Sequence, residues 1–157
     1  MEKTLIILKP DCWARELMGE AIGKIERKGM RIIAMKMMHV TKKLAAAHYE
    51  EHKGKPFLPS LFEYIMSGPV VPMVVEGRSA VEVCRTLIGP TESTIAAPST
   101  LRGEFSQSKR MNLVHGSDCV KSAKREIKLW FKNSEIMKTT QKDYRWVCAY
   151  EGVGDPL

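Results

Sequence analysis

Residues 3–9, KTLIILK, hold four consecutive apolar side chains between two lysines. A strand with one face in water alternates apolar and polar residues, whereas an unbroken apolar run is typical of a strand covered on both faces. This segment therefore predicts a central strand of a covered sheet. Runs of this length fall far short of the ~20 apolar residues that a membrane-spanning helix needs, so we expect no membrane span.

Helical and strand patterns alternate along the rest of the chain. Apolar spacing, N-cap residues and closing glycines predict helices over 19–28, 42–52, 60–68, 79–89 and 120–131, with Thr41 and Asp118 as N-caps of the second and the last. Strands are predicted over 30–40, 69–77 and 112–116. The methionines of 30–40 also suit a helix, and Pro72 is expected to demote part of 69–77 to an edge or a bulge.

This order matches a β-α-β-β-α-β plan with a helical hairpin inserted between the second and third strands. We therefore predict an α/β (α+β) fold of the ferredoxin-like type. Its antiparallel sheet would carry helices on one face and a site at its edge or far side. A chain of 157 residues is expected to form a single domain over 1–157.

Two segments do not follow the repeating pattern. Residues 89–111 show no apolar period, and a loop of that length in a compact domain is usually functional or disordered. It carries Thr91, Arg102, Lys109 and Arg110, which suit phosphate. The tail, 132–157, contains YRWVCAYEG and is too apolar to lie in water, so we expect it to pack on the body or on a neighbouring subunit.

The charge and the cysteines narrow the class of protein. A formal net charge of +7 favours anionic partners such as nucleotides, nucleic acids or acidic surfaces. The four cysteines are scattered without C-x-x-C spacing, which argues against a zinc ribbon or a disulfide framework. Reduced thiols and the lack of a secretory-signal pattern favour a cytoplasmic location.

The segment NLVHGSD, residues 112–118, places a histidine at the exit of a predicted strand. Strand alternation puts His115 on one face with Leu113 and Ser117. Glu126 borders the buried face of the next helix, where a carboxylate needs a partner. A histidine oriented by Glu126 and Ser117 suits a nucleophile or a base, and a core histidine satisfied by its neighbours is the alternative.

Further polar groups lie on segments that the predicted fold could bring near the histidine. They are Lys9, Tyr49, Arg85, Thr91, Arg102 and Asn112. Cations with hydroxyl and amide donors can hold phosphate without a G-x-x-x-x-G-K-[ST] loop, which is absent from this sequence. The alternative is that each is a solvated surface group, because the sequence does not show that they converge.

Six segments together resemble the nucleoside diphosphate kinase family. They are TLIILKPD (4–11), EHKGKPF (51–57), SGPVV (67–71), STLRGEF (99–105), NLVHGSD (112–118) and SAKREIKLWF (122–131). The N-x-x-H-G-S-D pattern is the signature of that family. The resemblance implies a ping-pong transfer of the γ-phosphate of a nucleoside triphosphate, typically ATP, to a nucleoside diphosphate, with broad tolerance of base and sugar.

The resemblance also assigns expected roles to single residues. His115 matches the nucleophile that becomes a phosphohistidine, in this family at Nδ1, with Glu126, Ser117 and Lys9 as further catalytic residues. The expected phosphate and ribose contacts are Lys9, Tyr49, Arg85, Thr91, Arg102 and Asn112, and Phe57 is expected to stack on the base. Asp118 matches a residue that helps hold Mg²⁺, mainly through water. The family forms hexamers or tetramers, and the aromatic tail resembles that of the hexameric members.

A few loop residues depart from the family pattern. Members often have proline where Ser93 stands, a small apolar residue where Lys109 stands, and Gly-Arg where Arg110 and Met111 stand. PST at 98–100 replaces the commoner Pro-Gly-Thr. These differences leave the expected catalytic positions intact, and we expect Ser93 to loosen the loop.

Sequence motifs also suggest two other functions. HYEEH, residues 48–52, fits the H-x-x-E-H zinc-protease motif if both histidines share one helical face, although a solvated helix is the simpler interpretation. The basic helix 120–131 could bind nucleic acid weakly, and this binding would weaken with salt.

Overall fold

The computed structural model describes residues 1–147, so Cys148 and Tyr150 of the predicted tail lie outside the described residues. The strands are β1 (Glu2–Leu8), β2 (Arg31–Met35), β3 (Met38–His39), β4 (Pro69–Gly77) and β5 (Val114–Gly116). The α-helices are α1 (Pro10–Ala14), α2 (Met18–Arg27), α3 (Lys42–His48), α4 (Leu58–Met66), α5 (Ala80–Ile88), α6 (Leu101–Phe105) and α7 (Val120–Trp130). Short 3-10 turns are η1 (Glu50–His52), η2 (Ser93–Ile95), η3 (Asn133–Glu135) and η4 (Gln141–Tyr144).

The sheet has the order β2-β4-β1-β5, and each neighbouring pair is antiparallel. The helices α3 and α4 are inserted between β2 and β4, and β3 pairs with β4. The predicted ferredoxin-like plan with an inserted helical hairpin is confirmed. Leu5, Ile6, Ile7 and Leu8 are at most 1% exposed, so β1 is the covered central strand that its apolar run predicted.

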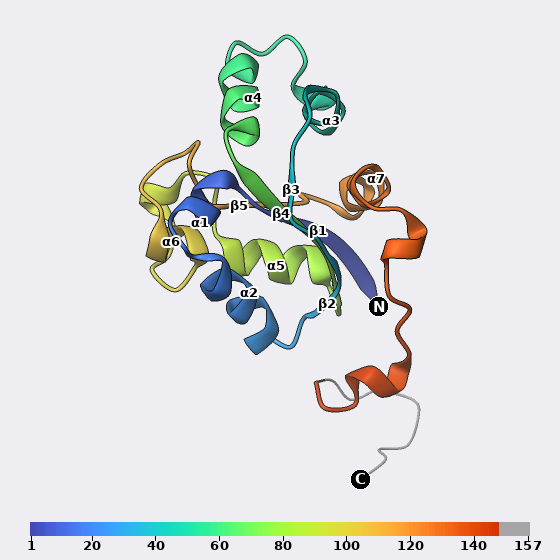
Figure 1. The fold of residues 1–157 in the computed structure, drawn as a ribbon. Helices are drawn as coiled ribbons and strands as arrows, with labels where there is room; N and C mark the ends of the chain where they lie inside the picture. Colours follow the sequence, from blue (N-terminus) through green and yellow to red (C-terminus); the bar gives the residue numbers. More distant parts are fainter. Residues whose placement is uncertain (148–157) are drawn as a thin grey trace.

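Helices cover both faces of this sheet (Figure 1). Ile6 and Leu8 pack with residues of α1, α2, α5 and α6, whereas Leu5 and Ile7 pack with residues of α3, α4 and α7. The expectation of helices on only one face was therefore wrong. Because consecutive apolar side chains of β1 point to opposite faces, a second helical layer is needed to cover the other half of them.

Pro72 does not make β4 an edge strand, because β4 lies between β1 and β2. The ladder to β2 ends at the Met35–Met73 pair, and the ladder to β3 begins at Val70. The carbonyl of Pro72 accepts a bond of 3.2 Å from the backbone N–H of Lys36 in this gap. A proline fits here because its missing N–H falls where the neighbouring ladder is interrupted.

Several predicted helix details differ from the structure. Thr41 caps α3 as predicted, with its hydroxyl accepting from the Leu44 N–H at 3.2 Å. However, α3 ends at His48, and His52 lies on the separate turn η1. The N-cap of α7 is Cys119 rather than Asp118, because the thiol sulfur accepts the Ser122 N–H at 3.4 Å.

The segment 89–111 is more ordered than its sequence pattern predicted, since it contains η2 and α6. Thr100 starts α6 by accepting the Gly103 N–H at 3.0 Å. A Cβ atom on Gly103 would lie 2.1 Å from the carbonyl oxygen of Ala97, so this position requires glycine. A five-residue helix is too short to show an apolar period, which is why the sequence did not predict it.

The described part of the tail runs along the β2 side of the sheet. The Met137 N–H donates to the carbonyl of Ile33 at 2.8 Å, and the hydroxyls of Thr139 and Tyr144 donate to the carboxylate of Glu76. Tyr144 is buried, and these contacts hold residues 137–144 on the body. Among residues 1–147, no helix is both long and apolar enough to cross a lipid bilayer.

Candidate active site

A cavity of about 790 Å³ opens where β1 ends beside β5, between α3, α4, α5 and α7. Nearly all the residues that the sequence singled out line it: Lys9, Tyr49, Phe57, Arg85, Thr91, Arg102, Asn112, His115, Asp118 and Glu126. Ser117 is fully buried behind this lining. The fold therefore brings together groups that lie on different segments of the chain.

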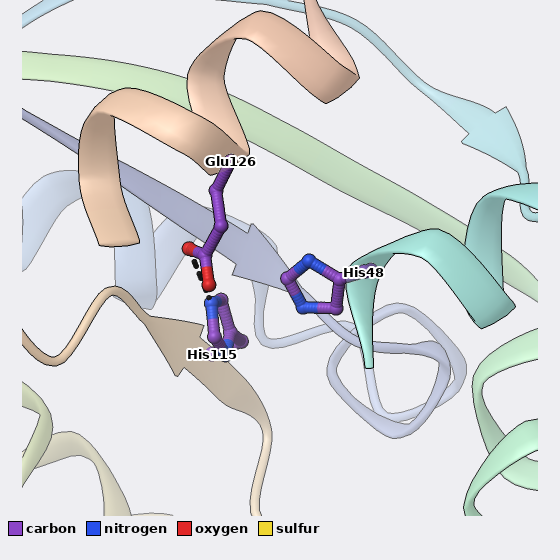
Figure 2. A group of neighbouring side chains, drawn as sticks. All are labelled: His48, His115 and Glu126. Atoms are coloured by element: carbon purple, nitrogen blue, oxygen red, sulfur yellow. Dashed lines mark hydrogen bonds and ion pairs between the residues drawn. The ribbon is translucent and has the colours of Figure 1, made fainter. Parts of the chain in front are cut away.

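The side chains of His115 and Glu126 point toward each other, as Figure 2 shows. Nε2 of His115 lies 3.0 Å from Oε2 of Glu126, and the Ser117 hydroxyl donates to the same oxygen at 2.7 Å. β5 positions His115 by pairing it with Ile7 of β1, and α7 presents Glu126 from the other side. Since Nε2 is committed to the carboxylate, Nδ1 is the ring nitrogen left for chemistry.

Glu126 is buried yet remains a carboxylate. Burial alone would raise its pKa, but the hydrogen bonds from His115 and Ser117, with the charge of Arg125, leave the pKa of Glu126 below its ordinary value. An ionised carboxylate at Nε2 favours a proton on that nitrogen and stabilises positive charge on the ring.

Leu113 adopts a left-handed conformation just before the strand, with φ at 68°. Its N–H donates to the Asp11 carboxylate at 3.0 Å, and its carbonyl accepts the Lys9 N–H at 2.8 Å. Leu113 and Val114 therefore pack in the same apolar cluster. The predicted shared face of His115 and Leu113 was wrong because strand alternation begins only after this turn.

Lys9 is buried at the end of β1, and its Nζ donates to Asn112 Oδ1 at 2.6 Å. Burial, together with the charge of Arg102, lowers the pKa of Lys9 to about 7. The Asn112 amide donates to the carbonyls of Thr91 at 3.1 Å and Lys109 at 2.9 Å. Asn112 thus joins the end of β1 to both ends of the long loop.

Arg102 is also buried, and its guanidinium reaches three backbone carbonyls. It donates to the carbonyl oxygens of Gly89 at 2.9 Å, Asn112 at 3.3 Å and Val114 at 2.6 Å. Burial and the nearby charge of Arg85 lower the pKa of Arg102 to about 10. Arg102 fastens the loop to the strand of His115 and adds positive charge to the cavity.

Comparisons with known proteins identify the family of this chain. The family model described as nucleoside diphosphate kinase matches residues 2–136. The chain belongs to the nucleoside diphosphate kinase family. It is similar to the nucleoside diphosphate kinases of Archaeoglobus fulgidus, at 49% identity over 94% of this chain and 97% of that protein, and of Mycobacterium avium, at 53% over 85% and 98%.

Solved structures of the same family share the fold. The nucleoside diphosphate kinase of Halobacterium salinarum in complex with CDP superposes with a TM-score of 0.91, at 38% identity over 94% of this chain and 99% of that one. The nucleoside diphosphate kinase family protein from Babesia bovis gives a TM-score of 0.90, at 39% identity over 94% and 100%.

Ser93, a departure from the common pattern of nucleoside diphosphate kinases, does not leave the loop untethered. It is buried, and its hydroxyl donates to the Ser108 carbonyl at 2.9 Å. The expectation that Ser93 loosens the loop conflicts with this bond, which ties η2 to the segment just before Asn112.

Sequence analysis did not place His48 beside His115. Its ring lies 4.6 Å from that of His115, centroid to centroid, and its Nδ1 accepts the Trp130 Nε1–H at 3.1 Å. The zinc-protease motif does not form, because His48 is buried at the end of α3 whereas His52 lies on η1. The burial of His48 would have indicated its role, but this burial depends on packing against residues far away in the chain, such as Trp130.

On distance alone, His48, His115 and Glu126 could hold a metal ion, since their ligand atoms lie within 4.8 Å of one another. Hydrogen bonds already use Nδ1 of His48, Nε2 of His115 and Oε2 of Glu126. The group therefore fits a hydrogen-bonded cluster better than a metal centre. Asp118 is the better oxygen ligand, because hydrogen bonding from Ser122 lowers its pKa.

Proposed function

We infer that this chain is a nucleoside diphosphate kinase that transfers the γ-phosphate of a nucleoside triphosphate through a phosphohistidine at Nδ1 of His115. The observation that carries this inference is the 3.0 Å contact between Nε2 and Glu126, which commits one ring nitrogen and leaves the other for attack. Membership of the family and the cation-lined cavity support the same substrate class.

The reaction divides into two displacements at phosphorus. Nδ1 of His115 forms a bond to the γ-phosphorus while the bond from that phosphorus to the bridging oxygen breaks, and the nucleoside diphosphate leaves with those electrons. The proton on Nε2 stays between His115 and Glu126, where the carboxylate balances the positive charge that the ring gains. A second nucleoside diphosphate then reverses these bond changes and leaves as a triphosphate.

The cavity lining supplies contacts for the nucleotide. We assign the phosphates and the ribose to Lys9, Tyr49, Arg85, Thr91, Arg102 and Asn112, which all line the cavity. Phosphoryl transfer depends mainly on positioning and on neutralising charge, which such groups provide. Phe57 is about half exposed at 48% and offers a face for stacking, which tolerates any base.

Family membership supports a divalent cation in the reaction, and we propose Mg²⁺. Asp118 lines the cavity and is ionised, so it would hold the ion through water, and the substrate phosphates would supply the other oxygens. The bound ion would screen the phosphate charge. Asp118 would thus supply few of the ligands, which suits Mg²⁺, because this ion keeps several waters and binds substrate phosphates.

Labelling with γ-³²P-ATP and Mg²⁺ tests the proposed intermediate. We expect an acid-labile label on the wild type that is transferred to GDP, and no label on His115→Ala. His39→Ala is the matched control, because His39 is exposed and lies on β3 outside the cavity lining. A folded wild type that takes no label, or a His115→Ala variant that keeps it, would refute the mechanism.

We further propose a homo-hexamer, which is supported by exposed apolar side chains at Met35, Met37, Ile95 and Met111. Light scattering coupled to gel filtration should give six times the chain mass of 17.7 kDa. A tetramer or a monomer would contradict this proposal. Free thiols at Cys12, Cys84 and Cys119 support a cytoplasmic location, which cell fractionation would test.

Weak nucleic-acid binding is a second candidate function. Lys121, Lys124 and Lys128 are exposed on α7, whereas Arg125 of the same helix contacts the Ala47 carbonyl and Glu51. We expect DNA binding that weakens steeply with salt and is lost when the three lysines become glutamine.

A further inference from the structure

His48 lies buried at the centre of a group of aromatic rings. Only 4% of it is exposed. Its ring meets those of His115 and Tyr49 nearly edge to face, each at 4.6 Å between centroids, and that of Trp130 at 5.4 Å. Figure 2 shows His48 and Glu126 both beside His115, one from α3 and the other from α7.

The hydrogen bond from Trp130 selects one tautomer of His48. An indole N–H is a donor only, so Nδ1 of His48 must be an unprotonated acceptor, and the neutral ring carries its proton on Nε2. A protonated His48 would turn an N–H toward the Trp130 N–H and break this bond. Burial, first of all, lowers the pKa of His48 well below its ordinary value, and positive charge adds to this effect from His115, Arg125, Lys9 and His52.

We propose that Trp130 and His48 form a positioning pair for the nucleophile, in which Trp130 holds His48 neutral in one tautomer and His48 packs against the ring of His115. This inference rests on the proposed function. Glu126 fixes the Nε2 end of the His115 ring through a hydrogen bond. The edge-to-face contact with His48 limits rotation of that ring about the Cβ–Cγ bond of His115. Together they direct Nδ1 to the cavity.

The neutral state of His48 matters as much as its shape. The ring of His115 gains positive charge when Nδ1 bonds to phosphorus, and Glu126 stabilises that charge. A cationic His48 at 4.6 Å would oppose it. The pair therefore places a polar ring against the nucleophile without adding charge.

Trp130→Phe removes the N–H and keeps an aromatic ring. We expect the rate constant for phosphorylation of His115 to fall about 10- to 100-fold, with the KM for ATP little changed, because the ring is misplaced rather than the nucleotide. Without the bond from Trp130 the neutral form of His48 is less stabilised, so the pKa of His48 should rise. The acid limb of the pH–rate profile should therefore move to higher pH. Trp146→Phe, at a residue that is 79% exposed, is the matched control and should match the wild type.

The double variant Trp130→Phe with His48→Phe separates positioning from simple packing. It places an uncharged ring against His115 and leaves no unpaired polar group, so we expect most of the lost rate to return. Because residue 48 can then no longer be protonated, the acid limb of the pH–rate profile should return to its wild-type position. A folded Trp130→Phe with the wild-type rate and pH profile would overturn the proposal. So would a double variant as slow as the single one.

A second measurement needs no variant and no phosphate transfer. Nitrogen NMR of protein labelled with ¹⁵N-histidine should show His48 protonated on Nε2 and unprotonated on Nδ1. A proton on Nδ1, or a mixture of tautomers, would refute the pair. Because this result does not depend on turnover, it distinguishes failure of the pair from failure of the proposed kinase reaction, which the labelling of wild-type His115 reports.

Discussion

Ser117 donates a hydrogen bond of 2.7 Å to Oε2 of Glu126, the same oxygen that faces the ring of His115. Ser117 is fully buried, and its backbone N–H also donates to the Leu5 carbonyl at 3.1 Å. The carboxylate of Glu126 therefore cannot rotate without breaking two contacts. The strand β1 thus holds the orientation of Glu126 through Ser117.

Glu126→Gln should reduce the phosphorylation rate about 10²–10³-fold, because an amide does not balance the charge that develops on His115. Rapid-quench labelling with γ-³²P-ATP measures this rate. Ser117→Ala keeps the carboxylate and loses one hydrogen bond worth about 1 kcal/mol, so we expect less than about a tenfold loss. Equal losses in the two variants would show that orientation, rather than charge, dominates.

Nucleotide binding should take up a proton at Lys9. Its pKa in the free protein is lowered to about 7, so most of the side chain is neutral at higher pH. A bound phosphate favours the ammonium form and raises that pKa again. At about pH 8 we expect uptake of about one proton per ADP. Calorimetry in two buffers with different ionisation enthalpies measures it.

Lys9→Arg is the control for this linkage, since a guanidinium stays protonated and can bind without uptake. Affinity of the wild type should fall as pH rises above about 7, where the free protein has lost the charge. Uptake that persists in Lys9→Arg would assign the proton to another group.

Arg102→Lys should lower the free energy of unfolding by about 2–4 kcal/mol, because an ammonium cannot reach three separated carbonyls and leaves buried acceptors unpaired. Urea unfolding at constant m-value measures the loss. Arg85→Lys is the comparison, since Arg85 is exposed in the same cavity and should change stability by less than about 0.5 kcal/mol. Similar losses would contradict a fastening role for Arg102.

Ser93→Ala should destabilise the protein by about 1 kcal/mol through loss of the bond to the Ser108 carbonyl. Ser93→Pro loses the same bond but stiffens the unfolded chain, a gain of about 0.4–1 kcal/mol at a compatible site. Glu92 already has the extended backbone that a following proline prefers, so the two effects should nearly cancel. Thermal unfolding measures both variants, and a clear stabilisation by proline would mean that the Ser93 hydroxyl contributes little.

The sequence predicted best where the pattern was local and periodic. The unbroken apolar run identified β1 as a central strand, and the helical spacing placed Glu126 at a buried edge facing His115. The order of helices and strands along the chain then indicated the ferredoxin-like plan, because few topologies connect such elements without crossing.

The features that sequence analysis missed depend on contacts between distant residues. The sequence suggested that Arg102 binds phosphate. In the structure its guanidinium donates to backbone carbonyls, which lie close to it only after the loop has folded. Burial of His48 depends on Trp130, 82 residues later in the chain. Spacing rules describe neighbours on one element and give no information about such pairs.

The left-handed turn at Leu113 has a consequence for how the enzyme folds. A leucine seldom adopts this conformation, which costs about 1–2 kcal/mol, and the carboxylate that accepts its N–H comes from Asp11, 102 residues away in the chain. Local propensity therefore opposes the turn, and a contact between segments 102 residues apart makes it favourable. A newly synthesised chain cannot form the turn beside His115 until these two distant segments have met, so recovered activity reports long-range folding rather than the presence of helices.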